Sequence, residues 1–367
     1  MTNNSPKSLY IHIPFCEAIC DYCDFPKLQY FTFFAEKYLF YLQKELDSYV
    51  IGKDLKTIYI GGGTPTSLED HLFEKLLKMV LPYTKNIQEY TIEANPESLS
   101  LNKLKLMKKY GVNRLSIGVE STDDKILKAI NRHHTFSDVK KAIKMAKEVG
   151  FDNINVDLIL GLPHCLKPQL KKDLDKLLSL PITNISCYSL SIHPHTSFYL
   201  KGIKEQNSDI ERELYDYVHS RLLEAGFIHY EISNWAKPHH ESIHNFTYWK
   251  DDRYYGVGLG AAGFIDNKRY TNTKSINQYL KGITIKEEEN IALEDDKEYF
   301  IMLNLRTNRG LIFEEYQKRF NEDFLKKNQQ KISQFVDNGL MVYEKDRIYL
   351  TYAGMMILDT IVMELLD

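Results

Sequence analysis

The chain has 367 residues, of which 43% are hydrophobic, and its formal net charge is −3. This is enough material for one large domain and a smaller one, and it excludes a short scaffold stapled by disulfides. The 47 basic and 50 acidic side chains are nearly balanced, so no nucleic-acid partner is expected. No segment reaches the run of about 18 apolar residues that a membrane span needs, and the polar start does not resemble a signal peptide. We therefore expect a cytoplasmic protein without a transmembrane segment.

Short β-branched and aromatic runs alternate with helical patterns through most of the chain. We predict strands at residues 8–13, 56–60, 89–93, 114–118, 153–159, 184–191 and 228–232, with helices at 33–49, 68–81, 137–149 and 169–178. Alternating strands and helices imply parallel strands joined by right-handed crossovers. With six or more such units, the predicted fold class is α/β, a partial (β/α)6-type parallel barrel.

The pattern changes near residue 282. The charged run at 286–289 is typical of a solvated linker or helix start. Beyond it we predict helices at 295–305, 313–319 and 329–338, a hairpin within 340–350 and a last helix. We therefore expect a barrel domain at 1–282 and a small winged-helix-like α+β domain at 283–367.

Three of the five cysteines form the run Cys16-x3-Cys20-x2-Cys23. The run follows the first predicted strand, at the end of the barrel strands where α/β barrels carry their chemistry. Thiolates are ligands of iron–sulfur clusters, and three thiolates on four irons leave one iron open. On spacing alone, a zinc site and three unpaired buried thiols remain alternatives, although no second Cys/His pair of the zinc type is evident.

The segment from Tyr10 through Cys23 resembles the radical SAM superfamily, in the branch of oxygen-independent coproporphyrinogen III dehydrogenase and its relatives. The resemblance extends over nearly the whole chain. It implies a [4Fe–4S] cluster on Cys16, Cys20 and Cys23. It also implies that the open iron chelates S-adenosylmethionine (SAM).

A run of three glycines followed by Thr64 ends the second predicted strand. Glycines let a backbone approach a ligand closely, although such a run is equally a tight strand-to-helix turn. By resemblance it lines the methionine part of SAM. The SAM contacts that the resemblance implies are Tyr10, Tyr22, Gly62, Gly63, Thr64, Glu93, Glu120, Arg132 and Asp157. Each carboxylate taken singly is more commonly a surface charge or helix cap, and relatives often have glutamine at position 120.

Two departures separate this chain from the dehydrogenases. Those enzymes carry a further cysteine two residues after the third, where this chain has Phe25, and they have an extra segment before the cluster. Both departures match a sister group of heme chaperones. The run from His244 to Trp249 fits the His-Asn-x-x-Tyr-Trp motif of that group.

The resemblance implies that His244 binds heme, since imidazole is a common axial ligand of heme iron. The residues alone favour a structural histidine among core aromatics. Cys165 is the next candidate for a heme ligand, although a buried inert thiol is the commoner case.

We therefore expect a heme chaperone that delivers heme to heme-dependent apo-proteins, including membrane-bound ones, and that carries a cluster and a SAM pocket. No residue is assigned to porphyrinogen oxidation. The alternative function is that of a radical SAM coproporphyrinogen III dehydrogenase, and the pocket alone also leaves another radical SAM reaction open, such as methyl transfer. A homodimer and a peripheral position at the membrane are compatible with either function.

Overall fold

The computed structural model of the protein describes residues 5–366. Its main sheet has twelve strands in the order β14-β13-β12-β11-β1-β4-β5-β6-β7-β8-β10-β9. The six central parallel strands are β1 (Ser8–Ile13), β4 (Thr57–Gly62), β5 (Glu89–Ala94), β6 (Arg114–Glu120), β7 (Asn153–Leu160) and β8 (Asn184–Ser189). The predicted α/β class and partial (β/α)6-type barrel are confirmed.

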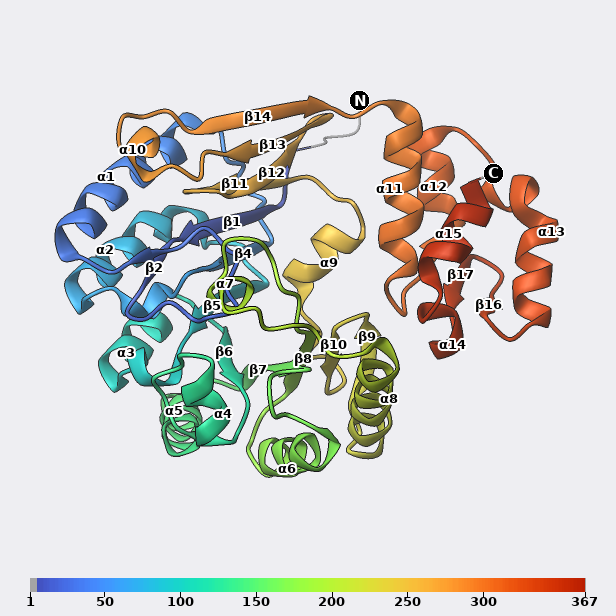
Figure 1. The fold of residues 1–367 in the computed structure, drawn as a ribbon. Coiled ribbons are helices and arrows are strands. Elements are labelled where there is room, and N and C mark those ends of the chain that lie inside the picture. The colour runs from blue at the N-terminus through green and yellow to red at the C-terminus, as the bar shows by residue number, and fades with distance from the viewer. Residues whose placement is uncertain (1–4, 367) are drawn as a thin grey trace.

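Helices cover the outer side of this curved sheet (Figure 1). They are α1 (Thr32–Ser48), α2 (Asp70–Val80), α3 (Leu101–Lys109), α4 (Asp124–Ala129), α5 (Phe136–Val149), α6 (Lys167–Leu178) and α8 (Ser208–Glu224). Short elements complete the crossovers: β2 (Phe15–Cys16), β3 (Leu28–Gln29), η1 (Pro65–Ser67), η2 (Leu81–Tyr83), η3 (Pro96–Ser98) and α7 (Ser197–Leu200).

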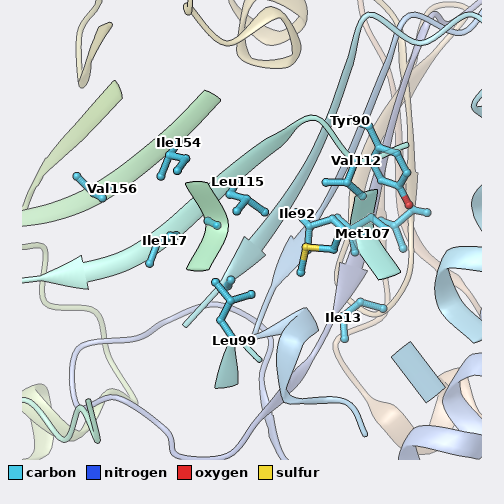
Figure 2. Close-up of a cluster of buried hydrophobic side chains, with 14 of the residues drawn as sticks. Ile13, Tyr90, Ile92, Leu99, Met107, Val112, Leu115, Ile117, Ile154 and Val156 are labelled. Atoms are coloured by element: carbon cyan, nitrogen blue, oxygen red, sulfur yellow. The ribbon is translucent and has the colours of Figure 1, made fainter. Parts of the chain in front are cut away.

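The central strands are buried along almost their whole length because helices cover one face and the barrel interior the other. Ile92, Leu115 and Ile154, from three neighbouring strands, are fully buried in one large hydrophobic cluster. Figure 2 shows these side chains together with Met107 of α3. This cluster packs the strands against the helices that cover them.

Both edges of the parallel sheet are extended by further strands, of which only β9, predicted at 228–232, was expected from the sequence. β11 (Tyr254–Val257) runs parallel to β1, and β12 (Ala262–Ile265), β13 (Lys268–Asn272) and β14 (Ile285–Asn290) follow it antiparallel. At the other edge, β10 (Asn234–Ala236) and β9 (Ile228–Glu231) are antiparallel. The helices α9 (Ile243–Trp249) and α10 (Ile276–Tyr279) lie between these strands in the sequence.

The prediction that residues 286–289 form a linker or helix start was wrong. These residues belong to β14, whose side chains are all exposed. Pairing with β13 satisfies the backbone of β14 without a buried face, so the strand shows no hydrophobic alternation.

The C-terminal part has its own hydrophobic core, formed by buried residues between Phe300 and Leu365. Its elements are α11 (Leu293–Leu305), β15 (Leu311–Ile312), α12 (Phe313–Phe320), α13 (Phe324–Asp337), β16 (Met341–Tyr343), β17 (Arg347–Leu350), α14 (Tyr352–Met355) and α15 (Leu358–Leu366). Helices followed by a β15-β17-β16 sheet match the predicted winged-helix-like α+β unit, which lies to one side of the barrel in Figure 1. Among the helices within residues 5–366, none has the length and apolar character needed to cross a membrane.

Candidate cluster and SAM site

A cavity of about 370 Å³ opens at the carboxyl ends of the parallel strands. Its wall contains all three cysteines of the 16–23 run. It also contains most of the predicted SAM contacts, namely Tyr22, Gly62, Gly63, Thr64, Glu93, Glu120, Arg132 and Asp157. The fold therefore brings together residues that lie far apart in the sequence, from the loop after β1, from β4, β5, β6 and β7, and from the segment between α4 and α5.

The loop that carries the cysteines is closed at its base. β2 pairs with β3, so that Cys16 lies opposite Gln29, and the Tyr30 N–H donates to the Cys16 carbonyl at 2.9 Å. On its far side, the Asp21 N–H donates to the Ile130 carbonyl at 3.2 Å. These backbone bonds fix the cysteines without using their thiols.

The three thiols are available as ligands, and their surroundings suit a metal cluster. Burial raises the pKa of Cys16 to about 12 and that of Cys23 to about 11. Both are therefore neutral thiols until a metal displaces the proton. The Arg132 Nη1 donates to Cys20 Sγ at 3.5 Å, which places a cation beside the anionic sulfur that a metal-bound cysteine would carry.

No three His, Cys, Asp or Glu side chains within residues 5–366 converge on a single metal ion. A [4Fe–4S] cluster does not require such convergence, because each thiolate binds a different iron. Cys16, Cys20 and Cys23 all line the cavity, so they could supply the three thiolates that would hold such a cluster.

The glycines are required by the close packing of β4 against β1. Gly62 has φ +115°, and a Cβ there would lie 2.4 Å from the His12 ring. A Cβ on Gly63 would lie 2.8 Å from the Phe15 carbonyl oxygen. Because these positions have no side chains, the strands approach closely, and the Gly62 N–H donates to the Glu93 carboxylate at 2.9 Å.

Buried carboxylates give the cavity its electrostatic character. Burial raises the pKa of Glu93 and of Glu120 to about 7, and it also raises the pKa of Asp157. Arg132 lies 3.6 Å from Glu120, and its buried Nε has no hydrogen-bond partner among the described residues. A ligand with cationic groups and a carboxylate, such as SAM, matches this mixture of acids and one guanidinium whose Nε has no partner among the described residues.

Tyr10 does not line the cavity. Its hydroxyl hydrogen-bonds to His12 Nδ1 at 2.9 Å, while His12 Nε2 donates to the Pro26 carbonyl at 2.8 Å. Burial lowers the pKa of His12 to about 4, so the ring is neutral. Tyr10 thus lies one step behind the cavity wall and anchors the end of the cysteine loop through His12.

His244 lies at the opposite end of the barrel, beside the first residue of β4. It is fully buried, and its ring nitrogens hydrogen-bond to Thr57 Oγ1 at 2.8 Å and to the Tyr248 hydroxyl at 2.9 Å. Burial lowers its pKa to about 3, so the imidazole is neutral. The structure therefore does not bring His244 together with the other predicted site residues.

The sequence analysis missed several cavity residues. Asn95, Tyr59, Tyr188, His193 and Lys27 also line the wall. Asn95 stands two positions after Glu93, so its strand-end position was a usable signal. The other four are brought to the wall by the fold, and no local pattern marks them.

The parallel barrel and the cysteine-lined cavity define the class of protein. Residues 10–177 match the Radical SAM superfamily, and residues 291–357 match the HemN C-terminal domain. The chain therefore carries a radical SAM domain, and the cofactors of that class are a [4Fe–4S] cluster and SAM.

Full-length relatives identify the family. The heme chaperone HemW of Bacillus subtilis (strain 168) is 37% identical over 363 residues, which cover 95% of this chain and 96% of the relative. The heme chaperone HemW of Escherichia coli (strain K12) is 34% identical over 318 residues, covering 83% of this chain and 84% of the relative. The chain belongs to the HemW family.

A solved structure supports the fold. The radical SAM enzyme coproporphyrinogen III oxidase (HemN) from Escherichia coli aligns with a TM-score of 0.83 over 99% of this chain and 90% of that one. The two share 22% sequence identity, so the similarity shows a common fold.

Proposed function

We propose that this protein is a heme chaperone that binds heme and delivers it to heme-dependent apo-proteins. The observation that carries the proposal is the similarity to heme chaperones named HemW along nearly the full length of both chains. Phe25 agrees with it. The ring is 62% exposed at the cavity wall, at the position where the dehydrogenases would have a fourth cysteine.

The cluster and SAM site has a proposed division of roles. Cys16, Cys20 and Cys23 hold the cluster, and the cavity residues named above hold SAM, with Tyr10 supporting the loop from behind. When bound, the cluster supplies one-electron reduction of SAM. Arg132 orients the ligand carboxylate, while the Glu93 carboxylate faces its cationic part.

A second candidate function is that of a radical SAM coproporphyrinogen III dehydrogenase. The observation in its favour is the complete cavity, in which cysteines, glycines and acids share one wall. Phe25 opposes it because phenylalanine offers no ligand at that position. The chaperone function is preferred, and porphyrinogen oxidation is not proposed for this chain.

Heme ligation by His244 stays a prediction, and it would require α9 to move away from β4. Both ring nitrogens are occupied and the side chain is fully buried. An iron could reach the ring only after α9 separates from β4. If this opening takes place, exchange of heme at His244 is slow.

The location and assembly of the protein are proposed from the same function. We propose cytoplasmic heme transfer with peripheral contact at the membrane when the acceptor is membrane-bound, and a homodimer as the candidate assembly. We also propose that the domains divide near residues 282 and 283. The separate core beyond Phe300 supports two domains, although β14 still bonds to the barrel sheet.

The test is made on the anaerobically reconstituted protein that contains its cluster. Hemin titration is expected to saturate at one heme per chain. Incubation with SAM, a reductant and coproporphyrinogen III is expected to yield no protoporphyrinogen IX. Saturable hemin binding with no porphyrin product supports the chaperone, whereas product formation without hemin binding establishes the dehydrogenase.

A further inference from the structure

We propose that heme binds on the outer rim of the cysteine-lined cavity, with His193 as an axial ligand of the iron. This inference rests on the proposed heme-binding function and gives that function a site. The rim is the part of the cavity wall formed by Asp24, Phe25, Lys27, Tyr188 and His193.

The rim combines two segments that meet at the cavity wall, where His193 lies beside Asp24. Asp24, Phe25 and Lys27 come from the cysteine loop, whereas Tyr188 and His193 come from the end of β8 and the turn after it. Phe25 is 62% exposed and Tyr188 is 44% exposed. Large rings left in solvent beside a cavity offer flat apolar surface, which is what a porphyrin plane requires.

His193 has the features of an available iron ligand. Its side chain is 50% exposed, and its Nε2 lies 3.5 Å from Asp24 Oδ2. Within residues 5–366, its Nδ1 has no hydrogen-bond partner, and no other histidine lines this cavity. Metal-binding histidines commonly direct one ring nitrogen to a carboxylate and use the other for the metal.

The turn that carries His193 is held in place. The Thr196 backbone N–H and hydroxyl both donate to the His193 carbonyl, at 3.2 and 2.7 Å. Two residues later, the Phe198 N–H donates to the Asp21 carbonyl at 2.9 Å. These bonds fix the turn against the cysteine loop, so His193, Asp24 and Phe25 keep their relative positions.

The remaining chemistry of heme is also matched at the rim. Heme carries two propionates, and Lys27 places an ammonium group on the same wall, where it bonds to the Cys23 carbonyl. An open rim suits a protein that must release its heme, because the ligand can leave without unfolding a helix. His244, buried with both nitrogens bonded, lacks that property.

The test is a hemin titration of the anaerobically reconstituted full chain with SAM bound, followed through the Soret band. His193→Ala is expected to bind hemin about tenfold or more weakly, with a shifted Soret band, because one axial ligand is lost. Added imidazole is expected to restore the wild-type spectrum in His193→Ala.

Phe25→Ala is expected to weaken hemin binding without changing the iron content. The matched control is His71→Ala, which removes an exposed histidine on α2 outside the cavity and is expected to behave as wild type.

Three outcomes would overturn the site. If wild type saturates with hemin and His193→Ala gives the same affinity and spectrum, heme binding stands and the rim is not its site. If His193→Ala also loses cluster iron or SAM binding and imidazole restores nothing, His193 has a structural role. If wild type shows no saturable binding, the proposed function fails together with this site.

Discussion

The Glu93 side chain shows how burial and binding compete at one residue. Its carboxylate accepts hydrogen bonds from the Tyr59 hydroxyl at 2.7 Å and from the Gly62 N–H at 2.9 Å. Both bonds favour the ionised form, yet burial dominates and raises its pKa to about 7. Near neutral pH the residue is poised between a neutral acid and a carboxylate that attracts a cation.

A Glu93 pKa near 7 predicts that SAM binding depends on pH. If SAM binds best to ionised Glu93, its affinity should rise about tenfold from pH 6 to about pH 8, because only about a tenth of a group with pKa near 7 is ionised at pH 6. Glu93→Gln should bind SAM weakly with little of this rise. Calorimetric titration of SAM across that range measures the effect.

Glu120→Gln provides the control, because the pKa of Glu120 is also raised to about 7. If the rise of SAM affinity with pH persists in Glu93→Gln and disappears in Glu120→Gln, Glu120 and not Glu93 is its cause. Stability should change in the opposite sense. At pH values between the ordinary glutamate pKa and about 7, Glu93 is protonated in the folded chain but ionised in the unfolded chain. The free energy of unfolding therefore falls as the pH rises through this range.

Gly63 gives a second prediction for a single residue. A Cβ at this position would meet backbone atoms of Pro14 and Phe15 at 2.8–2.9 Å, directly before Cys16. Gly63→Ala should therefore lower the free energy of unfolding by about 2 kcal/mol and reduce the iron bound per chain. Chemical unfolding and iron analysis after reconstitution measure the two effects.

The matched variant is Gly111→Ala, where φ is +89° and no atom lies within 4 Å of the added Cβ. It should cost about 1 kcal/mol through backbone strain alone and leave the iron content unchanged. Equal iron loss in both variants would show that general destabilisation, not the shape of the cysteine loop, limits cluster binding.

At the scale of elements, α9 is attached to the amino end of the barrel by one buried carboxylate. Glu89, the first residue of β5, accepts hydrogen bonds from Ser242 Oγ at 3.0 Å, the Ile243 N–H at 2.7 Å and the His244 N–H at 3.2 Å. These donors include backbone groups at the start of the helix that no helical carbonyl can satisfy. The strand therefore caps the helix across a distance of more than 150 residues in the sequence.

Glu89→Gln should loosen α9 selectively. An amide supplies one acceptor oxygen and no charge, so we expect a loss of about 2 kcal/mol and faster hydrogen exchange in residues 243–249. Ser100→Ala, which removes the exposed cap that accepts the Lys103 N–H at 3.1 Å, is the control and should cost about 1 kcal/mol with α9 unaffected. Unchanged exchange in α9 would show that other contacts hold the helix.

The elements also show what could be predicted from the sequence. The six parallel strands were found because each is a buried run between helices, and the cysteine run was found because its spacing is local. β14 was missed because its six side chains are all exposed, so only pairing with β13 makes it a strand. The positions of His193 and His244 could not be predicted, because the turn after β8 and the cap from Glu89 depend on contacts between distant segments.

At the scale of the whole molecule, a buried charge network joins the C-terminal unit to the barrel. Asp251 follows α9 and is 2% exposed, and it pairs with Arg269 of β13 and Arg319 of α12. The Arg319 Nε also donates to Asp296 of α11 at 3.0 Å. Burial raises the pKa of Asp251 to about 6, so the carboxylate depends on both arginines to stay ionised at neutral pH.

Removing one of these arginines should release the C-terminal unit before the barrel unfolds. In Arg319→Met, Asp251 keeps Arg269 but loses its partner on α12, and Asp296 loses a hydrogen-bonded cation, so we expect a cost of about 3 kcal/mol. Hydrogen exchange should accelerate in α12 and α13 while β4, β5 and β6 stay protected. Arg347→Met is the control, because its pair with Glu344 is partly exposed on both sides and should contribute little to stability. If α12 and the barrel strands lose protection together in Arg319→Met, the two parts unfold as one unit. The C-terminal unit would then be a structural extension of the barrel, with no independent movement during heme transfer.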